Sequence, residues 1–377
     1  MSIYVDYAAT TPIDESILQE MLNNADKFGN PSSIHRIGKE AKAFYEQSRQ
    51  RVAKHLNARA DEIVFTGSAT EANNFVIRGI SGFYEKPHII TTNVEHASVK
   101  ETFDDIKENV DITYLNVNET GLIDVDELKA ALRPETKLVS IIMVNNETGT
   151  IQPVEAIANV LNETDALFHI DAVQAFKQLP IDVKALSCDF LTLSGHKLNA
   201  PKGIGVLYVK NNTHIKRMIT GGSQERERRA GTENTLYAYA MSLAVEKAAE
   251  NRERNTEQLN LLKDSFIKSL EDDKVPFEIN GDISNQTGHI LNLYFPWSES
   301  EYLLTALDMK GVYASGGSAC NAGTVVPSHV ITAMYDKDRS KHSLRFSFSE
   351  QLSPSDIKTV SSALSKIYNN LNENGFI

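Results

Sequence analysis

The amino-acid sequence predicts an α/β protein: a large domain built on a mostly parallel sheet covered by helices, plus a smaller α+β domain. Short runs of Val, Ile and Leu, such as 138–144 and 190–193, alternate with amphipathic stretches, as in sheets buried on both faces. From residue 233 this alternation gives way to one long helical stretch. The length of 377 residues is too great for one small core, which favours two domains.

The first two-thirds of the chain open with an extended arm over residues 1–15, in which Asp14 is the expected N-cap of the first helix. A turn-rich loop is expected at 28–32. Helices are predicted at 15–24, 39–56, 69–84, from about 97, at 124–132 and at 154–161. Strands are predicted at 63–66, 88–92, 112–117, 138–144, 168–171, 190–193 and 206–209.

The last third begins with a helical stretch over 233–270, whose polar section at 250–258 is interpreted as a solvated face. Strands are then predicted at 290–295, 312–313 and 344–348, and helices at 300–308, 330–334 and 355–370. No repeat, low-complexity segment or flexible linker interrupts the pattern. We therefore expect a large domain at 16–250 and a small domain formed by 1–15 and 251–377.

Composition narrows the functional classes. A net charge of −12 and a pI near 5.4 argue against direct nucleic-acid binding, but leave open a partner that handles RNA. The only cysteines are Cys188 and Cys320, without CxxC spacing, so a disulfide framework and a structural zinc site are not expected. The N-terminus lacks signal-peptide features, and no apolar stretch is long enough to cross a bilayer. We expect a cytoplasmic protein.

The strongest chemical signal is Lys197, at the end of the apolar run 190–193. A lysine that leaves a buried strand is desolvated, which lowers the pKa of its ammonium group and frees the amine to condense with an aldehyde. Ser194 and His196 beside it offer donors for a phosphate. This pattern points to pyridoxal phosphate (PLP), although a simply solvated lysine is the plain alternative.

Other strand ends carry groups that would complete such a site, because ligands bind beyond the carboxyl ends of parallel strands. Residues 67–70 open a helix and could seat a phosphate, or serve as an ordinary N-cap. His96 could stack on a flat ring or cap a helix, and 145–149 could orient a ring oxygen or form a turn. Asp171 could pair with a protonated pyridine nitrogen or cap a helix. Their occurrence at successive strand ends favours PLP.

The two cysteines have different surroundings. Cys188 begins a buried strand and is expected to be structural. Cys320 lies in 314–323, a stretch of small and glycine residues with little apolar material to hold it. We therefore expect Cys320 to be a nucleophile.

These residues resemble the cysteine desulfurases, PLP enzymes of the aspartate-aminotransferase-like fold type I within the class-V aminotransferases. The loop around Cys320 is similar to the long-loop, NifS/IscS-like subclass. Ser223 and Glu227 depart from the pattern, since they interrupt an otherwise glycine-rich approach to Arg228. The resemblance rests on the motifs at 6–12, 28–33, 69–71, 95–96, 145–147, 171–174, 194–197, 228–234, 317–320 and 345–347.

The resemblance implies roles for individual residues. Lys197 would form the Schiff base with PLP, His96 would stack on the ring and move protons, and Cys320 would receive sulfur. Thr232 would reach the phosphate of a neighbouring subunit. The further cofactor contacts implied are Ala69, Thr70, Asn146, Asp171, Gln174, Ser194 and His196, and the substrate contacts are Asn30, Asn146 and Arg345.

The implied reaction converts L-cysteine to L-alanine and leaves the sulfur as a persulfide on Cys320. A homodimer would pass this sulfur to a protein acceptor in iron–sulfur cluster assembly, tRNA thiolation or another thio-cofactor pathway. No resident metal site is expected, although a cluster could be ligated transiently through Cys320. A selenocysteine lyase, a small-substrate aminotransferase and a sulfur-relay protein with an inactive PLP site remain alternatives.

Overall fold

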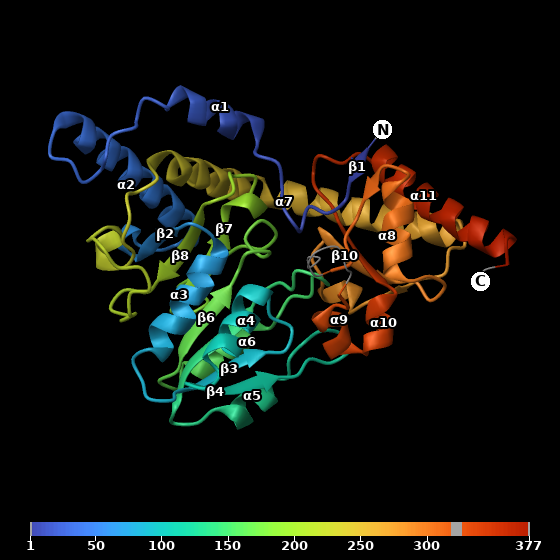
Figure 1. Cartoon of the computed structure of the whole chain (residues 1–377), viewed down its shortest axis with the longest axis horizontal. Coiled ribbons are helices and arrows are strands. Elements are labelled where there is room, and N and C mark those ends of the chain that lie inside the picture. The colour runs from blue at the N-terminus through green and yellow to red at the C-terminus, as the bar shows by residue number, and fades with distance from the viewer. Residues whose placement is uncertain (1, 318–325, 376–377) are drawn as a thin grey trace.

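The computed structural model describes residues 2–317 and 326–375, which Figure 1 shows as two groups of elements linked by a long helix. The expected mostly parallel sheet is confirmed. In order across the sheet, its strands are β2 (Ile63–Thr66), β8 (Gly205–Val209), β7 (Phe190–Ser194), β6 (Leu167–Asp171), β5 (Thr136–Ile142), β3 (His88–Thr92) and β4 (Asp111–Leu115). Among them, β8 alone runs opposite to the other strands.

Helices cover this sheet and begin where the sequence supplies caps. Asp14 caps the first helix as expected, since its carboxylate accepts a hydrogen bond from the Ser16 N–H at 3.0 Å. The second helix begins earlier than expected because Nδ1 of His35 accepts from the Gly38 N–H at 3.2 Å. The helices are α1 (Glu15–Asn23), α2 (Arg36–Leu56), α3 (Ala69–Ser81), α4 (Ala97–Ile106), α5 (Val125–Ala131) and α6 (Val154–Leu161).

The second group of elements packs around a three-stranded antiparallel sheet and a two-stranded parallel one. The N-terminal strand joins this group by pairing with β11. The elements are β1 (Ile3–Tyr4), β9 (Glu278–Ile279), β10 (Ile290–Tyr294), α8 (Ser300–Asp308), β11 (Val312–Tyr313), α9 (His329–Met334), α10 (Lys337–Lys341), β12 (Ser343–Ser347) and α11 (Pro354–Glu373).

The long helix α7 (Thr235–Asp272) links the two groups (Figure 1). Its first half contributes Met241 to the core beneath the large sheet, and its second half contributes Phe266 to the other core. The interpretation of its polar section as a solvated face is wrong on its inner side. Asn255 is buried there, and the Arg252 guanidinium donates to the Phe176 carbonyl at 3.1 Å. The Arg252 guanidinium therefore satisfies a backbone acceptor on this inner side of the helix.

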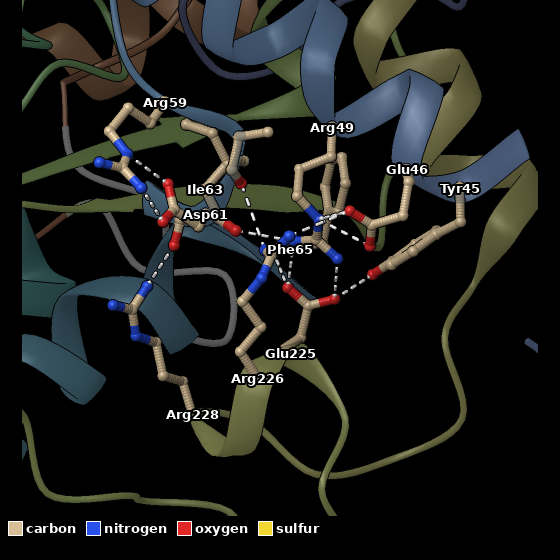
Figure 2. Close-up of polar contacts among 11 residues, drawn as sticks. Tyr45, Glu46, Arg49, Arg59, Asp61, Ile63, Phe65, Glu225, Arg226 and Arg228 are labelled. Carbon is tan, nitrogen blue, oxygen red and sulfur yellow. Dashed lines mark hydrogen bonds and ion pairs between the residues drawn. The ribbon is translucent and has the colours of Figure 1, made fainter. Parts of the chain in front are cut away.

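The segment between β8 and α7 is held at several points, and one of them, which is buried, we call the Glu225 anchor (Tyr45, Arg49, Phe65 and Glu225; Figure 2). The Glu225 carboxylate accepts hydrogen bonds from Nη1 and Nη2 of Arg49 at 2.7 and 2.9 Å, from the Phe65 N–H at 2.9 Å and from the Tyr45 hydroxyl. Glu225 and Arg49 are both buried. The anchor therefore fixes the segment that leads toward Thr232.

Two classes of feature are missing from the residues that the structure describes. None of the helices there combines the length and the apolar character needed to span a bilayer. Within the same residues, no group of three His, Cys, Asp or Glu side chains is arranged to bind a metal ion.

Candidate active site

Lys197 lies at the carboxyl end of β7, in a short 3₁₀ turn that continues the strand. Its amine donates hydrogen bonds to the carbonyl of Ala9 at 2.6 Å and to that of Ala8. Burial, followed by the positive charge of Arg345, lowers the pKa of Lys197 to about 7, against the opposing charges of Asp6 and Asp171. A large share of this amine is therefore unprotonated, and nucleophilic, near neutral pH.

Asp171 ends β6 and is buried beside Lys197's strand. Its carboxylate accepts hydrogen bonds from Nδ2 of Asn73 at 2.8 Å and from the Val173 N–H at 3.0 Å. Among the described residues, no cationic side chain lies within ion-pair distance of it. A buried carboxylate with only neutral donors is suited to receive a cation from a ligand.

His96 caps α4 and is joined to Asp171 through two side chains. Its Nδ1 lies 2.8 Å from Oγ of Ser98, which also accepts from Nδ2 of Asn73 at 2.9 Å. The His96 ring keeps accessible surface, yet the protein around it is close enough that desolvation lowers its pKa, against the charge of Asp171. The ring is therefore neutral at pH 7 and fixed through Nδ1, and its Nε2 makes no hydrogen bond to another described residue.

Arg345, on β12, reaches from the small sheet to the carboxyl end of β5. Its Nη1 donates to the Asn146 carbonyl at 2.8 Å, and its Nη2 pairs with Asp6 at 2.7 Å. Two buried atoms, Oδ1 of Asn146 and Nε of Arg345, have no partner among the described residues. Within the described residues, this acceptor and this donor are therefore available to a polar ligand.

The start of α3 has the geometry of a site that could receive a phosphate, and we call it the phosphate seat. Ser68 caps this helix by accepting from the Glu71 N–H at 3.1 Å, and the N–H groups of Ala69 and Thr70 have no partner within the helix. Ser194 pairs with Gly205, where a Cβ would lie only 2.7 Å from the Ser68 carbonyl carbon. The end of β7 is thereby held against the seat.

The turn that carries Lys197 is held by the N-terminal arm. Nδ1 of His196 lies 3.1 Å from Oγ1 of Thr10, and the His196 carbonyl accepts from the Thr11 N–H at 2.9 Å. Burial, then the charge of Lys197, lowers the pKa of His196 to about 4. The ring is thus a neutral hydrogen-bonding group beside the seat.

The remaining expected residues lie in different places. Gln174 is buried and donates through Nε2 to the Ala8 carbonyl at 2.9 Å, which joins it to the network around Lys197. Thr232 is exposed, and Asn30 accepts from the Ser32 N–H at 2.9 Å within its own loop. In the part of the chain that is described, no hydrogen bond brings Asn30 to Arg345.

Of the two cysteines, the structure describes only Cys188. Cys188 is a buried free thiol, as expected, and desolvation raises its pKa far above the usual range. Cys320 lies outside the described residues.

Four residues that help to hold the site, Asp6, Ala8, Ala9 and Asn73, were not predicted individually from the sequence. Asp6 pairs with Arg345, the Ala8 and Ala9 carbonyls hold Lys197, and Asn73 links Asp171 to Ser98. The motif at 6–12 pointed to the arm, but no periodicity says that its carbonyls face a lysine. For Asn73, the available signal was a polar side chain on the otherwise apolar face of α3.

The donor set fits PLP. The pyridine nitrogen would find a carboxylate without a cation in Asp171, and the phosphate would find the helix N-terminus at Ala69 and Thr70. The aldehyde would find a lysine that is largely deprotonated, and the unpaired Oδ1 of Asn146 offers a further contact. Fold and site together define a PLP-dependent enzyme of fold type I.

Comparison with known proteins identifies the family. The chain matches the aminotransferase class-V family over residues 3–360. A Dictyoglomus turgidum protein named cysteine desulfurase IscS is 39% identical over 374 residues, which cover 98% of this chain and 95% of that protein. The chain belongs to the class-V aminotransferase family, whose members are PLP-dependent enzymes.

Solved structures agree with this assignment. One described as a NifS-like protein superimposes with a TM-score of 0.92 at 31% identity, covering 98% of this chain and all 100% of the other. Another, described as SspA in complex with cysteine, gives a TM-score of 0.83 at 35% identity, covering 93% of this chain and 99% of the other. The resemblance drawn from the sequence motifs and the expected fold type are confirmed.

Proposed function

We propose that this chain is a PLP-dependent cysteine desulfurase that converts L-cysteine to L-alanine and carries the sulfur away on Cys320. The relatives named cysteine desulfurase, each close to 40% identical over nearly the full chain, support this activity. The observation that carries the proposal is Lys197, whose pKa is lowered to about 7 between Asp171 and Arg345.

In the proposed site, each cofactor group has a holder in this chain. Asp171 would pair with the pyridine nitrogen, His96 would face the ring, and Gln174 and Asn146 would address the ring oxygen. The phosphate contacts would be Ala69, Thr70, Ser194 and His196. When bound, PLP supplies an electron-withdrawing ring that weakens the Cα–H bond and prepares the Cβ–S bond of the substrate for cleavage.

Substrate orientation would depend on Arg345. Its guanidinium is buried and aimed at the carboxyl end of β5, where it can hold a carboxylate by two parallel hydrogen bonds. In the structure, one side of the fork is already paired with Asp6. Substrate binding would therefore redirect Nη2, whereas the unpaired Nε is available from the start.

Proton movement would belong to Lys197 and His96. The displaced Lys197 amine has a pKa suited to accept the Cα proton at neutral pH. His96 is neutral, and Nδ1 is held by Ser98, so Nε2 is the atom that can exchange a proton.

Sulfur would move to Cys320 by attack of its thiolate on the substrate sulfur, which breaks the Cβ–S bond. Cysteine and one thiol then give alanine and one persulfide, so atoms and electrons balance without an external oxidant. The persulfide would pass to a protein acceptor, in iron–sulfur assembly or in tRNA thiolation. We place this reaction in the cytoplasm, because the buried free thiol of Cys188 suits a reducing compartment.

A homodimer would complete the site. Thr232 and Asn30 are exposed in the chain, so both are open to a second copy. The region around α1 and α2 also exposes large apolar side chains, with Leu22 at 63%, Phe28 at 78% and Ile34 at 89%. Apolar groups gathered in this way are typical of an interface between protein chains.

The test is the Cys320→Ala variant of the PLP-loaded enzyme, assayed for sulfide and alanine released from L-cysteine. We expect loss of sulfide release, with the cofactor absorbance retained. Release at the wild-type rate would instead indicate a lyase or aminotransferase that needs no thiol. Absence of alanine from the wild-type enzyme would point to a sulfur-relay protein and overturn the proposal.

A further inference from the structure

Glu147 is a buried carboxyl group that none of the roles above uses. It follows Asn146 at the carboxyl end of β5, and its own backbone is fixed on both sides. The Glu147 N–H donates to Oδ1 of Asn145 at 2.9 Å, and its carbonyl accepts from Nδ2 of Asn292 at 3.1 Å. The side chain therefore projects from a rigid base.

This carboxyl group contacts both flanks of the segment 318–325. Its Oε2 accepts from the Ser328 hydroxyl at 2.5 Å, across 181 positions of sequence. On the other flank Gly317 has φ +103°, and a Cβ there would collide with the same Oε2. One oxygen thus meets the last described residue before the segment and a residue just after it.

The contacts on the Ser328 side are linked to α9. The same Ser328 hydroxyl accepts from the Ile331 N–H at 3.1 Å and so caps this helix. Nε2 of the next residue, His329, donates to the Glu95 carbonyl at 2.9 Å. A change at Glu147 would reach the start of α9 directly.

The electrostatic surroundings agree with a structural contact and not with an ion pair. Burial raises the pKa of Glu147, against the Ser328 hydrogen bond and the charges of His329 and Arg345. Arg345 itself is paired with Asp6. Among the described residues, no cation lies within 4.0 Å of the Glu147 carboxyl group.

We propose that Glu147 is a positioning residue for sulfur transfer, which fixes both flanks of the segment that carries Cys320 relative to the cofactor site. The inference rests on the proposed function, because it takes Cys320 as the sulfur acceptor. Glu147 does not touch the reacting atoms. It acts through Gly317 and Ser328, the described residues that it contacts on either side of 318–325.

The first test needs no turnover, because it measures the alkylation of Cys320 by iodoacetamide. The only other cysteine, Cys188, is buried with a raised pKa, so the reagent reports on Cys320. With its flanks released, Cys320 in Glu147→Ala should alkylate about threefold faster or more. Glu62→Ala is the matched control, since it removes another buried carboxyl group, one bonded to the N–H groups of Arg59 and Asn211 and to neither flank, and its Cys320 should alkylate at the wild-type rate.

The second test separates sulfur transfer from cysteine binding in the PLP-loaded enzyme. Glu147→Ala should form alanine in a single turnover about tenfold more slowly, with the Kd for cysteine unchanged. Glu147→Gln keeps an oxygen for the Ser328 hydroxyl and should restore the rate. Ser328→Ala should slow transfer in the same direction, and Glu147→Ala/Ser328→Ala should be no slower than the worse single variant.

The outcomes separate this inference from the proposed function. If Glu147→Ala alkylates and transfers sulfur at wild-type rates, the role proposed for Glu147 is wrong. It is also wrong if Glu147→Ala raises the Kd for cysteine and leaves the transfer rate unchanged, because the substitution would then act through Asn146. Where Glu147→Ala does not fold, Glu147→Gln and Ser328→Ala decide through the same readouts. A wild-type enzyme that forms no alanine would defeat the proposed function, whereas the alkylation result would stand.

Discussion

Two parts of this molecule bury carboxyl groups in opposite ways. In the Glu225 anchor, the carboxylate faces the Arg49 guanidinium through two hydrogen bonds and also meets a hydroxyl and a backbone N–H (Figure 2). Glu95 and Glu147, near the candidate active site, are equally buried but have no contacting cation among the described residues. Burial raises the pKa of both, that of Glu95 to about 8.

This difference distinguishes the Glu225 anchor, which is structural, from the candidate active site. Pairing with Arg49 offsets the cost of burying both charges, which makes the Glu225 anchor a fixed point for the chain. Around the site, desolvation moves Glu95 and Lys197 toward their neutral forms near pH 7, and groups that titrate there can exchange protons. Arg345 is the exception in the site, because Asp6 keeps it paired.

The largest effect is expected on breaking the Glu225 anchor. Glu225→Gln leaves the buried Arg49 guanidinium without a counter-charge and turns an amide toward donors. The free energy of unfolding should fall by about 3–5 kcal/mol, measured by urea denaturation. Arg226→Gln is the control, since the Arg226–Glu46 pair is half exposed and should contribute less than about 1 kcal/mol. Equal losses in the two variants would erase the distinction between the two regions.

The second effect concerns Glu95 and depends on pH. Its folded-state pKa of about 8 exceeds the unfolded value, so the folded protein holds the proton more tightly. The stability from this group is complete below the unfolded pKa and is lost as the pH rises toward 8. Relative to wild type, Glu95→Gln should therefore gain roughly 3 kcal/mol of unfolding free energy between pH 5 and pH 8.

The measurement is a set of urea denaturation curves for both proteins across this pH range. The same comparison made with Glu350→Gln should show no such gain, since pairing with Lys177 lowers the pKa of that carboxylate against the effect of its burial. A stability difference between Glu95→Gln and wild type that stays flat with pH would show that Glu95 is ionised in the folded protein.

The third effect concerns Lys197, a basic group whose pKa is also shifted by burial. Because burial lowers the pKa of Lys197 to about 7, PLP capture by the apoenzyme should accelerate about tenfold per pH unit below pH 7 and level off above it. Stopped-flow absorbance would follow the reaction. Arg345→Gln removes a positive charge that lowers this pKa, so its midpoint should move upward. A rate that keeps climbing through pH 9 in the wild type would show an ordinary lysine.

The sequence predicts the backbone elements of this protein better than the side-chain contacts between them. Strand and helix positions follow from local apolar periodicity, so β2, β3 and α6 coincide with the expected ranges. The rule that ligands bind beyond the carboxyl ends of parallel strands likewise predicts Lys197, Asp171 and His96 at one edge of the sheet. Each of these predictions needs only information that is local in the sequence or fixed by parallel topology.

The contacts that hold the site together could not be predicted in this way. The pair Asp6–Arg345 spans 339 positions and the pair Glu147–Ser328 spans 181, and nothing in either local pattern names the partner. For the same reason, the sequence wrongly predicts that the whole polar section of α7 is solvated. A buried Asn255 and a solvated one look alike until the opposing surface is known.

The smallest effect tests the backbone beside the Glu225 anchor. Glu227 is exposed with φ +63°, where a glycine is favoured. Glu227→Gly relieves about 1–2 kcal/mol of left-handed strain but adds about 0.5–1 kcal/mol of unfolded-state entropy, so a net gain of about 0.5 kcal/mol is expected in urea denaturation. Glu227→Ala removes the side chain but keeps the strain, and should show no gain. In a Glu225→Gln background the segment can relax, so the gain from glycine should vanish. A gain that persists there would mean that something other than the anchor imposes the left-handed backbone.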